Sequence, residues 1–354
     1  MQPRTSQRRQ PMKATEHSRL KAVPIKEVAG DPCSLDIAAV IEGAKPLVIR
    51  GLVRDWPIVE LALQSDTAFA QRLSELDNGT DVTTLMIAAE ADGIIGYTPD
   101  LSGFNYEHFK VPVSWGLQRL ASYSRRKHAP GLVIQSVPIR SCLPGLLSDH
   151  SLPCLDPTVE PRLWMGNRTT TPTHFDSQHN IACVVCGARR FTLFPPDQLP
   201  NLYVGPLDFA PTGAAISLAR LDRPDDPRYP RLKLALAAAR VADLLPGDAI
   251  YIPPLWWHHV KSLEQLNALM NYWWSPVNVP GFHTGHGRAA LYHCLLAFKA
   301  LSPAERGAWR GLLDYFVFND ADGVAHIPEH RRGVLGPLTR ETVEKLKQGA
   351  RQNL

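Results

Sequence analysis

The residues with the clearest chemical potential are His174 and Asp176, an imidazole and a carboxylate two positions apart in the stretch TTTPTHFDSQHN. Residues i and i+2 of an extended strand point to the same face, so one strand would present a nitrogen and an oxygen ligand together. A third ligand is available 84 residues later, because His258 lies in the aromatic segment YIPPLWWHHV. Two histidines and one carboxylate are the ligand set of non-haem Fe(II) sites that leave coordination positions open. The spacing therefore predicts a metal site at His174, Asp176 and His258.

The composition is that of an ordinary soluble globular protein, with 44% hydrophobic and 20% charged residues in 354. The 31 prolines and 24 glycines are scattered along the chain, which favours many turns and a β-rich fold. A net charge of +4 does not indicate a nucleic-acid partner. No run of 18 apolar residues is present, and no apolar segment follows the basic N-terminus. We therefore expect neither a membrane span nor a signal peptide, and a cytoplasmic protein.

The six cysteines do not show the spacing of a disulfide framework in a chain of this length. Cys183 and Cys186 form a C-x-x-C, but they lie in an apolar run that predicts a strand, where residues i and i+3 face opposite sides. We therefore expect two packed thiols in a reduced compartment, and no zinc or redox site at this pair.

Three regions follow one another along the chain. Residues 1–22 are polar and basic without periodicity, and we expect a disordered arm. Residues 23–280 combine short apolar strands with Pro/Gly turns, which is typical of a small double-sheet barrel, and the metal-site core falls at 161–276. Residues 281–354 change to amphipathic helices whose apolar stripes need burial. We expect these stripes to pack on the barrel or to form a homodimer interface.

Local signals place several further elements. A helix is expected over 66–76, with Asp66 as its N-cap. Ser302-Pro303-Ala304-Glu305 is a capping box with proline at the first helical position. Residues 205–240 interrupt the strand rhythm and include a helix expected at 231–240. A long insertion between barrel strands is a natural lid or substrate loop.

Four segments carry a family resemblance, in this order: TPTHFDSQHN, FTLFPPDQLPNLY, PGDAIYIPPLWWHHV and LNALMNYWW. Together they resemble the JmjC or cupin-8 group of Fe(II)- and 2-oxoglutarate-dependent oxygenases, and look closest to the branch containing the factor-inhibiting-HIF asparaginyl hydroxylase. The resemblance covers about 161–275 and is weaker over 30–140. It implies a mainly β fold with helices: a double-stranded β-helix (cupin or jelly-roll) core, flanking N-terminal α/β elements and a C-terminal helical segment.

The resemblance also implies roles for individual residues. Iron would be held by His174, Asp176 and His258, with His259 pointing away. Around the cosubstrate 2-oxoglutarate, the matching positions supply a hydroxyl for the distal carboxylate and two amides: Thr171, Asn180 and Asn271.

Two positions depart from the family pattern. Where close relatives place a lysine against the distal carboxylate, this chain has Arg189, followed by Arg190. A guanidinium binds a carboxylate through two parallel hydrogen bonds, so Arg189 is the expected partner and Arg190 the alternative. Val133 occupies the position of a tyrosine that touches the same carboxylate in the asparaginyl hydroxylase.

By resemblance, the chain would be a 2-oxoglutarate-dependent dioxygenase that uses O2 to hydroxylate a C–H bond and releases succinate and CO2. A protein or peptide side chain is the favoured substrate, and a small molecule or a modified tRNA base is the alternative. A non-catalytic cupin-fold metal-binding protein and a cupin enzyme without 2-oxoglutarate also remain open. Lysine demethylation is less favoured, because no reader domain or zinc cluster is evident beside the barrel.

Overall fold

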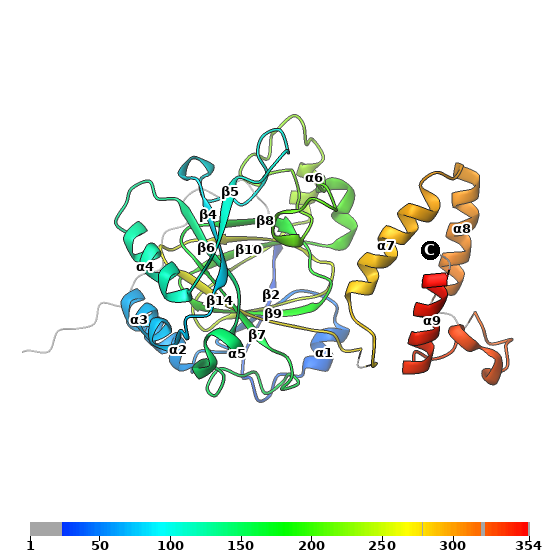
Figure 1. Cartoon of the computed structure of the whole chain (residues 1–354), viewed down its shortest axis with the longest axis horizontal. Helices are drawn as coiled ribbons and strands as arrows, with labels where there is room; N and C mark the ends of the chain where they lie inside the picture. Colours follow the sequence, from blue (N-terminus) through cyan, green and yellow to red (C-terminus); the bar gives the residue numbers. More distant parts are fainter. Residues whose placement is uncertain (1–22, 278, 320–322, 353–354) are drawn as a thin grey trace, which may run out of the picture. The chain divides into compact units, whose positions relative to one another are not determined.

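The computed structural model describes residues 23–277, 279–319 and 323–352 (Figure 1). The predicted disordered arm at 1–22 lies outside the described residues. The described chain divides into two compact units. The first consists of residues up to 176 together with 180–273, and the second of residues 177–179 together with those from 274 onward.

The first unit is built on two β-sheets, and the expected two-sheet core of a mainly β fold is confirmed (Figure 1). The five-stranded sheet has the order β1 (Val23–Pro24), β11 (Arg240–Leu244), β10 (Arg189–Phe194), β13 (Trp257–Ser262) and β8 (Thr170–His174). The nine-stranded sheet has the order β2 (Lys26–Ala29), β3 (Leu47–Arg50), β12 (Ala249–Ile252), β9 (His179–Cys186), β14 (Asn267–Trp274), β7 (Pro161–Gly166), β6 (Gly131–Pro138), β4 (Val82–Ile87) and β5 (Tyr106–Val111).

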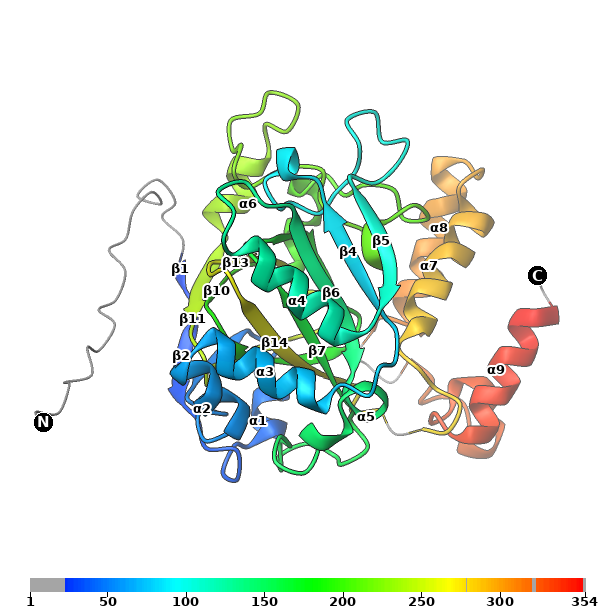
Figure 2. The same ribbon diagram turned by 60° about the vertical axis from the view of Figure 1, so that its left-hand side comes forward.

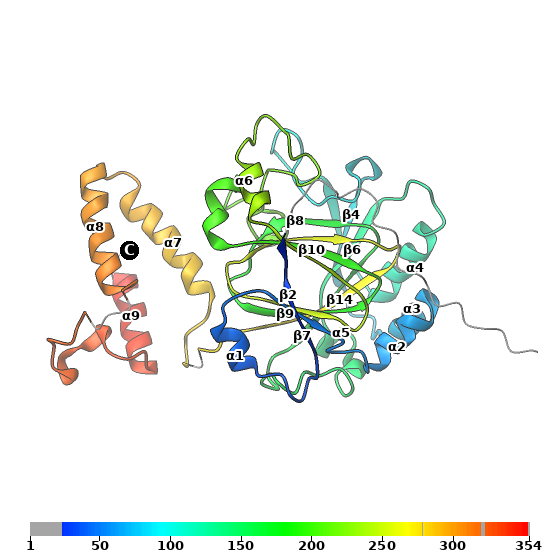
Figure 3. The ribbon, with the colours of Figure 1, turned by 180° about the vertical axis from the view of Figure 1, so that it is seen from behind.

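The dark blue segment containing β1 and β2 passes from one sheet to the other (Figure 3). β1 pairs in parallel with β11, and β2 pairs in parallel with β3. The two sheets enclose a core formed by their inward-facing side chains. Alternation along β10 sends Phe191 and Leu193 into this core, where they meet Val184 of β9 and Ile250 of β12.

Helices α2 (Pro57–Gln64), α3 (Asp66–Leu76) and α4 (Val113–Tyr123) lie side by side in front of the nine-stranded sheet (Figure 2). The predicted bounds of α3 are confirmed, but its predicted cap is wrong. The N-cap is Ser65, whose side chain accepts a hydrogen bond from the amide of Ala68, and Asp66 is the first helical residue.

The remaining helices of the first unit are short: α1 (Ile37–Glu42), α5 (Ile139–Cys142) and α6 (Leu232–Ala237). The prediction that a helix extends to residue 240 is wrong. Arg240 instead begins β11, where it pairs with Leu193 of β10, so strand pairing ends the helix early.

The second unit contains α7 (Gly285–Phe298), α8 (Pro303–Phe316) and α9 (Arg340–Gln352). The predicted capping box is confirmed, since Ser302 and Glu305 cap each other's backbone amides at the start of α8. Large apolar side chains on α7 and α8 are exposed, including Leu291, Leu295, Leu296, Leu312 and Phe316. No helix within the described ranges is long and apolar enough to cross a membrane.

Candidate metal centre

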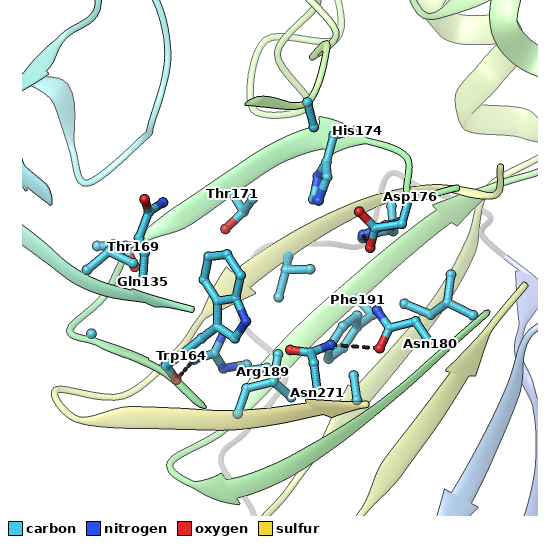
Figure 4. Close-up of a pocket in the computed structure, with 18 of the residues that line it drawn as sticks. Gln135, Trp164, Thr169, Thr171, His174, Asp176, Asn180, Arg189, Phe191 and Asn271 are labelled. Carbon is cyan, nitrogen blue, oxygen red and sulfur yellow. Dashed lines mark hydrogen bonds and ion pairs between the residues drawn. The ribbon is translucent and has the colours of Figure 1, made fainter. Parts of the chain in front are cut away.

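Three predicted ligands lie together at one end of a pocket between the two sheets (Figure 4). One ligand atom each from His174, Asp176 and His258 lies within 4.8 Å of the others. The imidazole rings of His174 and His258 are 4.1 Å apart between centroids. Oδ2 of Asp176 is 3.7 Å from Nε2 of His258. The arrangement offers two nitrogens and one oxygen to a single metal ion.

Both imidazoles are oriented by the same kind of backbone contact. Nδ1 of His174 is 2.9 Å from the carbonyl oxygen of Pro172, and Nδ1 of His258 is 3.1 Å from that of Trp256. A carbonyl can only accept, so each Nδ1 carries the proton and each Nε2 keeps its lone pair for a metal. Burial lowers the pKa of His258, and His174 beside it lowers that pKa further. His258 is therefore a neutral, ligand-competent imidazole.

A β-bulge places the site residues of β8. Across the β8–β13 pair, His174 lies opposite His258 but Thr171 lies opposite Val260, so β8 carries one extra residue between the two pairs. The extra residue breaks the two-residue alternation and lets Thr171 and His174 both face the pocket.

The expectation that His174 and Asp176 share one strand is wrong, because β8 ends at His174. Asp176 lies in the loop that follows. Its carbonyl accepts a hydrogen bond of 2.8 Å from the amide of Leu255, which connects this loop to the segment entering β13.

Arg189 lies in the same pocket, away from the histidines (Figure 4). It shares the inward face of β10 with Phe191 and is only 7% exposed. Its Nη2 donates to the carbonyl oxygen of Trp164 at 3.3 Å, while its buried Nε has no partner among the described residues. Burial lowers its pKa to about 10. No acidic side chain in the described part of the chain pairs with this cation.

The alternative cation, Arg190, faces the other side of the same strand. Its guanidinium forms two hydrogen bonds with Asp243, at 2.7 and 2.6 Å. His259 also lies on that outer face, as the resemblance implied, beside a separate cavity that Arg190 lines. Strand alternation therefore separates Arg189 from Arg190 and His258 from His259.

The predicted amides meet on neighbouring strands β9 and β14. Asn180 and Asn271 are both buried, and the amide nitrogen of Asn271 donates to the Asn180 oxygen at 2.8 Å (Figure 4). Thr171 lines the same pocket. All seven predicted site residues thus contribute to one cavity of about 130 Å³.

Four further polar side chains line the pocket and were not among the predicted site residues: Gln135, Trp164, Thr169 and Trp273. Trp273 donates from Nε1 to Oδ2 of Asp176 at 3.0 Å. Its position two residues after Asn271 on one strand was the available signal. No pocket role was assigned to Gln135, Trp164 or Thr169 from the sequence.

Part of the 205–240 insertion lies against the metal-site strand. The amide of Ser217 donates to the carbonyl of Thr173 at 2.8 Å, and Ala214 lines the pocket. The hydroxyl of Tyr97 donates to the carbonyl of Phe209 at 2.6 Å, joining the insertion to another loop. A lid or substrate-loop role for the insertion stays a prediction.

The C-x-x-C lies in β9 and both thiols are buried and free. Burial raises the pKa of Cys186 to about 12 and also raises that of Cys183. Neither thiol belongs to the group of candidate metal ligands found among the described residues, which is His174, Asp176 and His258.

Comparison with known proteins gives a family for the chain. The cupin-like domain family (cupin-8) matches residues 34–279. Jumonji C domain-containing protein 5 of Drosophila melanogaster is 33% identical over 141 residues, which is 37% of this chain and 34% of the relative. Lysine-specific demethylase JMJ31 of Arabidopsis thaliana is 35% identical over 112 residues, which is 31% of this chain and 20% of the relative. HSPB1-associated protein 1 of Homo sapiens is 33% identical over 154 residues, 42% of this chain and 30% of the relative.

The chain thus spans only 20–34% of the length of these three relatives. Its placement in the asparaginyl-hydroxylase branch stays a prediction. The match at 34–279 covers more than half of the 354 residues and nearly all of the two-sheet barrel. The chain is therefore a member of the cupin-like, JmjC-type domain family.

Proposed function

We propose that the protein is an Fe(II)- and 2-oxoglutarate-dependent oxygenase that hydroxylates a C–H bond on a protein or peptide side chain. The observation that carries the proposal is Arg189, a buried cation with no acidic partner, in the same small pocket as a two-histidine, one-carboxylate group. A buried charge is costly unless it is paired. A 2-oxo acid with a distal carboxylate supplies a metal-binding end and an anionic end at once.

The donor set fits Fe(II). Imidazole nitrogen and carboxylate oxygen suit this ion, and three protein ligands leave positions open for other molecules. When bound, the iron and 2-oxoglutarate supply the oxidation of a C–H bond coupled to decarboxylation of the cosubstrate. His174 and His258 present their Nε2 atoms, because backbone carbonyls hold their Nδ1 protons.

The pocket residues fit the cosubstrate. Arg189 would hold the distal carboxylate with the hydroxyl of Thr171 beside it. Asn180 and Asn271, hydrogen-bonded to each other, would fix the inner wall and offer the remaining amide hydrogens and oxygen. The apolar lining of the pocket, including Phe191 and Leu269, would exclude water around the bound acid.

The size of the pocket supports a large substrate that stays mostly outside it. Pockets for drug-sized ligands enclose about 300–1,000 Å³, whereas this cavity is about 130 Å³. Exposed apolar side chains lie on the loops joined by the Tyr97–Phe209 bond, namely Leu101, Leu207 and Phe209. An extended peptide could lie on such a surface and insert one side chain.

The test is an anaerobic titration of the metal-free protein with Fe(II) and then 2-oxoglutarate. We expect a weak visible charge-transfer band in the wild type, and no band in His174→Ala. Succinate formation from 2-oxoglutarate under air should then rise when a substrate is added. Bound iron with no band and no 2-oxoglutarate consumption would contradict the proposal and favour a cupin enzyme that does not use 2-oxoglutarate, or a non-catalytic metal-binding protein.

Identification of the substrate class requires separate assays, because hydroxylation and demethylation both begin with oxidation of a C–H bond. Unmodified peptide libraries are tested for a mass gain of one oxygen, and methyl-lysine peptides for loss of a methyl group with formaldehyde release. Small molecules and tRNA form the third arm. We expect the unmodified peptides to respond.

A homodimer through the C-terminal helices stays part of this proposal. It is motivated by the exposed apolar side chains of α7 and α8, such as Leu296 and Phe316. Sedimentation of the full chain should give twice the monomer mass. The Leu296→Glu variant should sediment with the mass of a monomer. A monomeric wild type would contradict the dimer and leave the proposed reaction untouched.

A further inference from the structure

Two buried hydrogen-bond donors on neighbouring side chains of the pocket have no acceptor among the described residues. One is Nε of Arg189 and the other is Nε1 of Trp164, on β7. The guanidinium of Arg189 contacts the Trp164 backbone directly, through the 3.3 Å bond from Nη2 to the carbonyl oxygen. Figure 4 shows the indole of Trp164 between Thr171 and Arg189. Buried donors in folded proteins are seldom left unpaired, so the pair indicates a missing acceptor.

No side chain of the described lining accepts a hydrogen bond from either donor in this structure. Asp176 is its only acidic member, and its Oδ2 already faces Trp273 and His258. The oxygen of Asn180 is taken by Asn271. Val133 of β6, which also lines the pocket, carries no polar group. A ligand in the pocket can supply the acceptor that these donors lack among the described residues.

We propose that the indole N–H of Trp164 donates to the distal carboxylate of the cosubstrate, beside the guanidinium of Arg189. This assignment rests on the proposed function and identifies a residue that helps to select a dicarboxylate. A carboxylate offers about four acceptor positions. Two donors from Arg189, the hydroxyl of Thr171 and the indole of Trp164 fill them.

The indole also adjoins the metal end of the pocket. Its ring meets that of Trp273 edge to face, at 6.1 Å between centroids. Trp273 in turn donates to Asp176. The two tryptophans therefore form one continuous wall that reaches from Arg189 to the metal ligands, and a shift of either ring alters the space for the bound acid.

The first test observes the indole directly, in the wild-type chain. The protein is labelled with ¹⁵N-tryptophan, loaded with diamagnetic Zn(II) and titrated with 2-oxoglutarate by NMR. Eight tryptophans give eight indole N–H signals, and Trp164→Phe identifies the one that belongs to Trp164. We expect its proton signal to move downfield on binding, because a carboxylate acceptor deshields it. The signal of Trp115, outside the pocket, should stay in place.

The second test measures affinity through the Fe(II) charge-transfer band. Trp164→Phe keeps a six-membered ring and removes the donor, so it should weaken 2-oxoglutarate binding about tenfold. Affinity for pyruvate, a 2-oxo acid without the distal carboxylate, should be unchanged. Trp115→Phe is the matched control and should alter neither affinity.

The outcomes separate this assignment from the proposed function. A wild type that binds no 2-oxoglutarate would overturn the proposed function, and the assignment with it. A wild type that binds 2-oxoglutarate while the Trp164 signal stays in place would overturn the assignment alone. Equal weakening of 2-oxoglutarate and pyruvate in Trp164→Phe would show that the ring acts in packing only.

Discussion

The indole nitrogen of Trp273 lies 3.0 Å from Oδ2 of Asp176, the same carboxylate oxygen that lies 3.7 Å from Nε2 of His258. The carboxylate follows the end of β8, outside the strand ladder, so backbone pairing does not fix its side chain. The indole supplies that restraint. Trp273 is therefore a positioning residue for the candidate metal centre.

Trp273→Phe should weaken metal binding by about 10- to 100-fold, because loss of a hydrogen bond to a metal ligand has effects of this size. The phenyl ring retains most of the packing, so the unfolding temperature should change little. Competitive titration of Zn(II) or Fe(II) against a chelator measures the effect. Trp274→Phe is the control, since its ring stacks on His179. Unchanged metal affinity in Trp273→Phe would remove the positioning role.

Arg189→Met should weaken 2-oxoglutarate binding by about 2–5 kcal/mol, the cost of removing one partner from a buried charge pair. Arg190→Met removes the same charge from the next residue. That guanidinium faces outward and pairs with the half-exposed Asp243. Because surface ion pairs contribute little, the affinity of Arg190→Met for 2-oxoglutarate should differ from that of the wild type by less than about twofold. Calorimetric titration of both variants decides the matter. A larger loss in Arg190→Met would mean that the wrong cation was assigned.

Gly187→Ala should destabilise the fold by about 2–5 kcal/mol. Gly187 turns β9 into β10 with a φ of +71°, and an added Cβ would collide with the carbonyl oxygen of Leu266. Left-handed backbone costs an alanine about 1–2 kcal/mol, and the collision adds about 1–3 kcal/mol. Gly79→Ala is the control, because φ is +81° there and no atom lies within 4 Å of the added Cβ. Equal losses in urea unfolding would show that the close approach is unimportant.

The buried thiols should resist alkylation in the native protein. With the pKa of Cys186 raised to about 12, only about one thiol in 10⁴ is ionised at pH 8, and the thiolate is the reactive form. Iodoacetamide should label the exposed Cys33 first, and Cys183 and Cys186 only after unfolding. Peptide mass spectrometry over a time course reports the order. Fast native labelling of Cys186 would contradict the structural role given to the C-x-x-C.

The free energy of unfolding should decrease as the pH is lowered, because of the titration of His150. Nδ1 of this buried ring lies 2.7 Å from the carbonyl oxygen of Leu146, and Nε2 accepts from the amide of Ile58 at 3.2 Å. Burial lowers its pKa below the ordinary value of 6.5. The unfolded chain therefore binds the proton more readily, and the free energy of unfolding decreases as pH falls below about 6.5.

His150→Leu removes this titration. Its free energy of unfolding, measured in urea between pH 7.5 and 5.5, should fall less steeply than that of the wild type, by up to about 1.4 kcal/mol per pH unit. Comparison of the two slopes cancels the contributions of the other histidines. His108→Gln, at an exposed position, should keep the wild-type slope. Identical slopes for His150→Leu and the wild type would exclude His150 as the source.

The sequence alone indicated the residues of the candidate site and the family. Histidine and aspartate types at short spacing, with a distant His258 after a Pro-Gly-Asp turn, restrict the chemistry before any geometry is known. From the sequence, Arg190 remained an alternative to Arg189, and the structure places the two on opposite faces of β10, as the side-chain period of a strand requires. Local signals also sufficed for α3 and for the capping box of α8.

Only the tertiary structure determined which side chains from distant segments contact one another. The bulge that turns Thr171 and His174 to one side depends on the pairing of β8 with β13, strands more than 80 residues apart. The hydrogen bond from Trp273 to Asp176 joins β14 to the loop after β8, a position that was predicted from the sequence to lie inside the strand. The unpaired hydrogen-bond donors of Trp164 and Arg189 lie near each other only because β7 and β10 both face the same pocket. Local sequence encodes periodicity and caps, whereas contacts between distant segments arise only when the sheets close on a shared core.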